Sequence, residues 1–118
     1  MADQGHTAVW DGKDVLEPFS WPQALVVLVT RDLFEPEVRG KFRDEVFASM
    51  ALCPQHQFKL RTAHPREYRR YVDEIARDRG EYLAWRASAA LILRRLDREG
   101  EATGPGPIWP LPNVALIV

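Results

Sequence analysis

A chain of 118 residues is long enough for one domain that buries about two-thirds of the surface its unfolded form exposes. The composition, 46% hydrophobic and 28% charged, argues against wholesale disorder and against a membrane protein. A formal charge of −1 gives no field that would attract a polyanion, so we expect no nucleic-acid partner.

The single cysteine, Cys53, cannot form an intramolecular disulfide, which favours a reducing compartment. No basic segment followed by an apolar run stands at the N-terminus, so no signal peptide is expected. The longest apolar run, Ala24 to Val29, is far shorter than the roughly 20 residues that span a bilayer. We expect a soluble cytoplasmic protein with no membrane partner.

The first predicted elements are an extended arm over residues 1–19, which show no regular hydrophobic period, and a helix over residues 21–32. Ser20 and Gln23 have the spacing of a capping box, which predicts that a helix begins here. The following run, Leu25–Val29, is apolar on every face and is typical of a centrally buried helix. Its β-branched residues also suit a buried strand, and length does not decide between the two.

A second helix is predicted over residues 36–50. It begins at Pro36 with acidic residues on both sides, which suits the positive end of a helix. Large apolar residues then recur every four positions, and they are Val38, Phe42, Val46 and Met50. This spacing places them on one face, so we expect an amphipathic helix.

Residues 51–63 are interpreted as a loop, and helical spacing returns over residues 65–99. Gly80 divides this stretch, either as a helix end or as a tolerated residue inside one long rod, and Gly100 is a stop signal. The predicted fold is therefore mainly α, with three to four helices in a domain over residues 20–100.

The tail, residues 101–118, changes character at Gly104 and becomes almost wholly apolar from residue 108 onward. Pro110 and Pro112 favour an extended conformation over a helix. Because exposed apolar segments of this extent usually mark contact surfaces, we expect the tail to lie across a partner protein or a second copy in a homodimer.

The chemistry-bearing residues do not assemble into a recognisable active site. Cys53, His56 and His64 could offer one thiolate and two imidazoles to zinc, but a fourth ligand and a paired cysteine are missing. No nucleophile motif and no phosphate-binding loop is present. We expect a chain that is not catalytic alone and binds no metal through Cys53 and His56.

Two segments, which together cover about half the chain, resemble the N-terminal part of nitrile hydratase β subunits and the related small accessory proteins. The first runs from the acidic-Pro-aromatic sequence Glu17-Pro18-Phe19 through Asp32-Leu33-Phe34 to Phe42-Arg43-Asp44-Glu45. The second is Glu81-Tyr82-Leu83-Ala84-Trp85, with the helix that follows it. Glu81 and Ala84 stand where that family has Tyr and His.

The resemblance implies a role beside another subunit. Nitrile hydratases hold cobalt or iron in a Cys-rich motif of the separate α subunit, so this chain would be a small β-type subunit or an activator that packs against that subunit. By the same resemblance, Arg43 would hydrogen-bond oxidised cysteine ligands of the partner's metal. The expected interface residues are Tyr82, Trp85, Trp109, Leu111 and Leu116. The alternative is a non-enzymatic interaction or adaptor module, regulatory or phage-encoded, that docks through its apolar tail.

Overall fold

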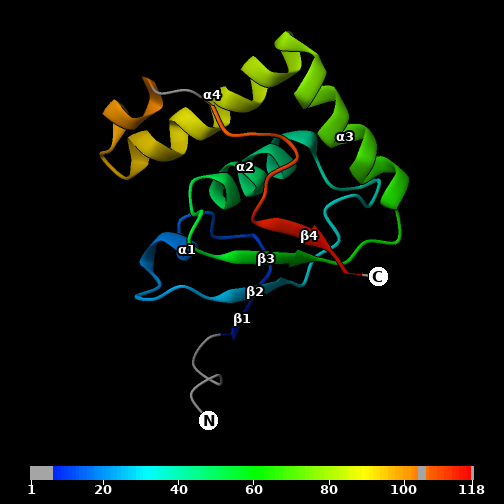
Figure 1. Cartoon of the computed structure of the whole chain (residues 1–118), viewed down its shortest axis with the longest axis horizontal. Coiled ribbons are helices and arrows are strands. Elements are labelled where there is room, and N and C mark those ends of the chain that lie inside the picture. The colour runs from blue at the N-terminus through cyan, green and yellow to red at the C-terminus, as the bar shows by residue number, and fades with distance from the viewer. Residues whose placement is uncertain (1–6, 104–105, 118) are drawn as a thin grey trace.

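The chain folds as an α/β domain, and the computed structural model describes residues 7–103 and 106–117. Its sheet has four strands, β1 (Thr7–Trp10), β2 (Val26–Val29), β3 (Gln57–Leu60) and β4 (Val114–Leu116). The helices are α1 (Glu17–Ser20), α2 (Gly40–Ala51), α3 (Pro65–Arg77) and α4 (Arg79–Arg95), followed by the 3₁₀ helix η2 (Glu99–Thr103). Figure 1 shows α2, α3 and α4 grouped on one side of the strands.

All neighbouring strands are parallel, and their order in the sheet, β1-β2-β3-β4, is their order in the chain. Val27 illustrates the register, because it pairs with Ala8 of β1 and with Phe58 of β3. Each connection between neighbouring strands contains at least one helix. The sheet therefore winds in one direction without the reversal of strand order that marks doubly wound folds.

The expectation of a mainly α fold is wrong, and the error lies chiefly in residues 21–32. The centre of this segment is strand β2, flanked on both sides by parallel strands. Ser20 does not cap a following helix, because it ends α1 and its hydroxyl donates to the Glu17 carbonyl at 2.7 Å. Branched side chains favour the pleated, buried environment that β1 and β3 supply, so tertiary context decided the structure of this run.

The described parts of the expected arm and tail belong to the same sheet as the rest. β1 comes from the segment 1–19 and β4 from the segment 101–118, and these are the two edge strands. Trp10 and Val114 are 2% and 8% exposed. The arm and the tail are therefore structural parts of one domain with the helices between them.

Most of the stretch 65–99 is helical, as predicted, but the break between its two helices lies at Asp78 and not at Gly80. Asp78 separates α3 from α4 in an extended conformation, with φ −104° and ψ 115°. Its carboxylate accepts a hydrogen bond from the Glu81 amide at 3.1 Å, which caps α4, while Gly80 lies inside the first turn. Among the described residues, no helix combines the length and the apolar character needed to cross a membrane.

The core lies between the helices and one face of the sheet. Side chains alternate along each strand, and those facing the helices are buried, namely Trp10, Val27, Val29, Phe58, Leu60 and Val114. Against them pack Val46, Phe47 and Met50 of α2 and Trp85 and Ile92 of α4. Each such side chain fully removed from water contributes roughly 1.5–3 kcal/mol, so this single layer carries most of the stability.

Candidate functional site: an uncovered sheet face and a cleft at the carboxyl edge

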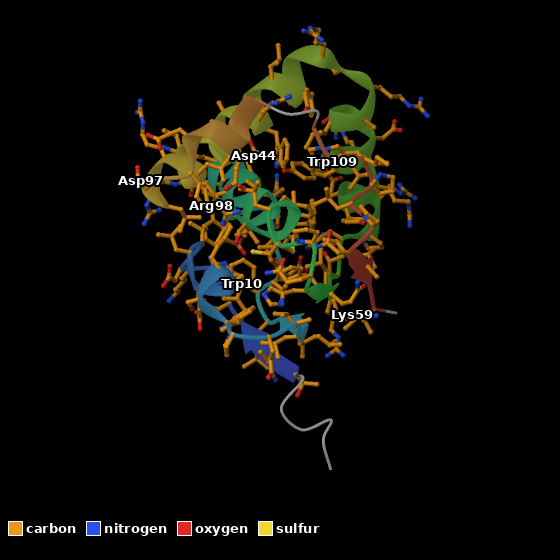
Figure 2. All side chains as sticks on the ribbon, turned by 60° about the vertical axis from the view of Figure 1, so that its left-hand side comes forward. Trp10, Asp44, Lys59, Asp97, Arg98 and Trp109 are labelled. Carbon is orange, nitrogen blue, oxygen red and sulfur yellow. The ribbon has the colours of Figure 1, made fainter. Side chains whose placement is uncertain are left out.

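In the part of the chain that the structure describes, α2, α3 and α4 cover one face of the sheet and leave the second face open. Its side chains are exposed or half-buried, and they are Thr7, Val9, Val26, Leu28, Gln57, Lys59 and Ala115. Val9 is 67% exposed and Val26 is 41% exposed. Figure 2 shows Lys59 at the sheet end of the molecule, remote from Asp97 and Arg98 near the end of α4. We call this surface the open face.

The open face is unusual because parallel sheets occur almost only with both faces covered. The sheet also ends in two strands, β1 and β4, whose outer edges pair with no other strand in residues 7–103 and 106–117. Such edges present backbone N–H and C=O groups that can pair with a further strand. The open face and the two edges together form one continuous candidate interaction surface.

A second feature lies where β2 and β3 end. Asp32 and Glu35 follow β2, and His64 follows β3. Because both strands run in the same direction, their carboxyl ends meet at one edge of the sheet, where parallel α/β proteins place their binding sites. One ligand atom from each of the three side chains lies within 4.8 Å of the others. We call these residues the carboxyl-edge cluster.

Asp32 joins the loops that follow β2 and β3. Its Oδ1 accepts from the Thr62 hydroxyl at 2.6 Å and the Phe34 amide at 3.0 Å, and its Oδ2 accepts from the Ala63 amide at 2.8 Å. Burial raises the pKa of Asp32, but the hydrogen bonds from Thr62, Ala63 and Phe34, with the nearby His64, together lower it below its ordinary value. The carboxylate is therefore fixed in position and ionised at neutral pH.

A cleft of about 410 Å³ adjoins the cluster. Its lining includes Glu35, His64, Arg43 and Tyr71, with further charged residues of α3. Arg43 is held by contacts within its own chain. Its Nε donates to the Leu33 carbonyl at 2.8 Å, and its guanidinium lies 4.9 Å from the centre of the Phe34 ring. The residue expected at a partner's metal thus forms the wall of a cleft in its own chain.

Tyr71, which lines the cleft, is hydrogen-bonded to a second titratable side chain, Asp44. The Tyr71 hydroxyl donates to Asp44 Oδ1 at 2.7 Å. Burial raises the pKa of Asp44, although this hydrogen bond and the charge of Arg43 partly oppose the rise. The pKa of Tyr71 is also raised, first by burial and then by the Asp44 charge. Tyr71 therefore stays protonated and works as a hydrogen-bond donor.

The residues expected at a partner interface lie in this chain's own core or pack against it. Trp85 and Leu111 are 2% and 3% exposed, and Tyr82, Trp109 and Leu116 are half-buried. The Trp109 ring stands edge-on to Trp85 with ring centres 5.0 Å apart. The apolar character of the tail is explained because it returns to the sheet as β4 and closes the core.

Cys53 and His56 are both fully buried, and neither belongs to the carboxyl-edge cluster. The His56 Nδ1 accepts from the Leu25 amide at 3.1 Å, and its Nε2 lies 3.0 Å from the Pro18 carbonyl. A carbonyl only accepts, so Nε2 carries the proton and both nitrogens are occupied. Burial raises the pKa of the Cys53 thiol to about 12, which makes it an unreactive core residue.

The sequence pattern groups His64 with Cys53 and His56 as candidate metal ligands, and it gives Asp32 and Glu35 no ligand role. The signal that could have found them is their position directly after the apolar run of residues 24–29. That signal has meaning only if the run is interpreted as a strand, since polar residues after parallel strands converge at one edge.

The comparisons with known proteins identify a family but no activity. No curated protein and no solved structure matches the chain. A family model described as a protein of unknown function, DUF5131, matches residues 3–118. Because this match extends over nearly the whole sequence, the chain belongs to the DUF5131 family of proteins of unknown function.

Proposed function

We propose that this chain is an assembly module that binds a second copy of itself through the open face and the sheet edges. The observation that carries the proposal is a parallel sheet with helices on one face and exposed valines on the other. Val9 is 67% exposed and Val26 is 41% exposed, so full burial by a partner would add about 1–2 kcal/mol for Val9 and about 0.6–1.2 kcal/mol for Val26.

The strand order indicates what the partner supplies. Four parallel strands in chain order, with α2, α3 and α4 on one side of the sheet, have the arrangement expected of half an eight-stranded barrel. In a two-fold dimer, β4 of each copy could pair with β1 of the other, and no edge would remain. Two chains of 118 residues also fall within the roughly 200–400 residues of such barrels.

The open face suits the interior of such an assembly. Barrel interiors are filled by side chains from alternate positions of the strands, chiefly branched apolar ones. Val9, Val26 and Leu28 fit this description. Lys59 is the charged exception, and its long stem allows the methylenes to pack while the ammonium reaches solvent at the barrel mouth.

Sedimentation velocity or light scattering after size exclusion would test the proposal. We expect the wild-type chain to be a dimer and the Val26→Glu variant to be a monomer with unchanged helical circular dichroism. The matched control is Leu91→Glu, because Leu91 is 50% exposed on α4 and lies outside the open face. A monomeric wild type, a dimeric Val26→Glu variant, or equal dissociation by both variants would refute the proposal.

A nitrile hydratase-type assembly in the cytoplasm is a different form of assembly, in which a metal-binding α subunit and not a second copy would be the partner. It rests on the resemblance of short segments, one of which contains strand β2 where a helix was expected. Co-expression with a Cys-rich α subunit would test it. Co-purification, with metal loading reduced by Arg43→Lys, would support this form, and no association would exclude it.

A further inference from the structure

The carboxyl-edge cluster brings together three side chains of the kinds that bind divalent transition metals. It offers two carboxylates, from Asp32 and Glu35, and one imidazole, from His64. Mixed oxygen and nitrogen ligands of this type suit ions such as Mn²⁺, Fe²⁺ and Zn²⁺. We propose that Asp32, Glu35 and His64 form a binding site for one divalent first-row transition-metal ion.

The distances between the ligand atoms fit joint coordination. Oxygen and nitrogen ligands lie roughly 2.0–2.2 Å from such an ion, so adjacent ligands in an octahedron are about 3 Å apart and opposite ones about 4.2 Å. His64 Nε2 and Glu35 Oε2 are 3.5 Å apart, which lies within this range. The ligand atoms of all three side chains lie within 4.8 Å of one another, so a small movement of the partly exposed Glu35 side chain would bring them into one coordination sphere.

The surroundings of Asp32 resemble the outer shell of a metal site. Ligating carboxylates are normally fixed by hydrogen bonds of their own. Asp32 receives three, and since a carboxylate has about four acceptor positions, one remains on Oδ2 for an ion. Thr62 also accepts from the backbone amide of His64 at 2.9 Å, so the same hydroxyl ties the histidine to the carboxylate. The Asp32 carboxylate and the backbone of His64 are thus held together before an ion binds.

The site would keep open positions toward the cleft. Three protein ligands leave at least one place for water or a bound small molecule, as in catalytic metal sites. The cleft of about 410 Å³ lies on the side of Glu35 and His64. Its two arginines are engaged elsewhere, since Arg43 donates to Leu33 and Arg70 contacts Glu67 and Glu74. These contacts leave Asp32 and Glu35 available to a cation.

Calorimetric titration of the metal-free, full-length chain with Zn²⁺ or Mn²⁺ would test the proposal. We expect one ion per chain, with affinity at least tenfold weaker in the Glu35→Gln variant. The Glu35 side chain is 43% exposed, so this change should not disturb folding, which circular dichroism would verify. Glu67→Gln is the matched control, because it removes the same charge from the same cleft outside the cluster.

A second measurement locates the ion. Substoichiometric Mn²⁺ should broaden the NMR signals of the His64 ring and the Ala63 amide but leave the buried His56 ring sharp. The Val26→Glu variant should bind the ion as the wild type does, which separates this proposal from the assembly proposal. Absence of binding, equal weakening by Glu35→Gln and Glu67→Gln, or broadening that spares His64 would overturn it.

Discussion

Asn113 offers the sharpest test of how the C-terminal edge strand is joined to the helical layer. This side chain is 6% exposed and stands directly before β4. Its Nδ2 lies 2.9 Å from the Met50 carbonyl and 3.2 Å from the carbonyls of both Cys53 and His56. One side-chain amide therefore donates hydrogen bonds to backbone carbonyls at the end of α2 and in the turn that leads to β3. We expect Asn113→Ala to remove this connection.

The expected loss of stability follows from the number of hydrogen bonds that the Asn113 amide makes. An amide nitrogen has two hydrogens, so at least one of its three contacts is shared, and about two full hydrogen bonds are lost. Each contributes roughly 0.5–1.5 kcal/mol net. The carbonyls of Met50 and Cys53 keep the hydrogen bonds that they accept from the amides of Cys53 and His56, so no orphan penalty is added for them. We expect the free energy of unfolding to fall by about 1–3 kcal/mol, a large part of the roughly 5–15 kcal/mol typical of a domain.

Urea denaturation, followed by circular dichroism and by tryptophan fluorescence, would measure this change through the midpoint at constant m-value. The isosteric control is Asn113→Asp. At neutral pH its carboxylate would face three carbonyls and destabilise the protein further, whereas protonation at low pH restores one donor and reduces the loss. A loss below about 1 kcal/mol for Asn113→Ala, or no pH dependence for Asn113→Asp, would refute the reasoning.

Three further predictions concern single residues. Asp78→Ala should lower the free energy of unfolding by about 1 kcal/mol in urea, because α4 loses its N-cap, and an unchanged midpoint would contradict this. Gly12→Ala should cost at least roughly 1–2 kcal/mol by the same assay, since the backbone has a φ of 83° and the new Cβ would lie 3.1 Å from Val46. Asp44→Asn should raise the melting temperature at pH 7 while keeping an acceptor for Tyr71. The native pKa of Asp44 is raised above 3.8, so its stabilising contribution is complete below that pH and is lost as the pH rises through the native value. Thermal melts at pH 7 and pH 3.5 should therefore show a gain only at the higher pH, and an equal gain at both would contradict the sign.

The helices could be predicted from the sequence because their signals are local. The apolar residues four positions apart, such as Val46 and Met50, predict α2 to within one residue at its end, but the helix begins at Gly40, four residues after the predicted start. The region of α3 and α4 was found in the same way, although the break was assigned to Gly80. The break lies at Asp78 because its carboxylate accepts a hydrogen bond from the Glu81 amide and so caps the start of α4. Gly80 therefore lies inside α4 and does not end a helix.

The sheet could not be predicted, because its signals are not local. The run around Val27 is compatible with either a buried helix or a buried strand, and the choice depends on β1 and β3, which come from distant parts of the chain. The candidate site depends on the same choice. Asp32 and His64 approach each other only because β2 and β3 are parallel and adjacent, so an interpretation without strands could not bring them together.

The edge position of β4 has a consequence for the order in which the domain folds. Paired residues of β1 and β2, such as Thr7 and Val26, are 19 positions apart in the chain, whereas Phe58 of β3 and its partner Val114 are 56 positions apart. Closing the longer loop costs about 1 kcal/mol more in chain entropy. The β1–β2 pair and α2 therefore have the kinetic advantage, and β4 docks late onto a partly formed layer. Substitutions in β4 should chiefly accelerate unfolding, while substitutions in β2 should slow folding.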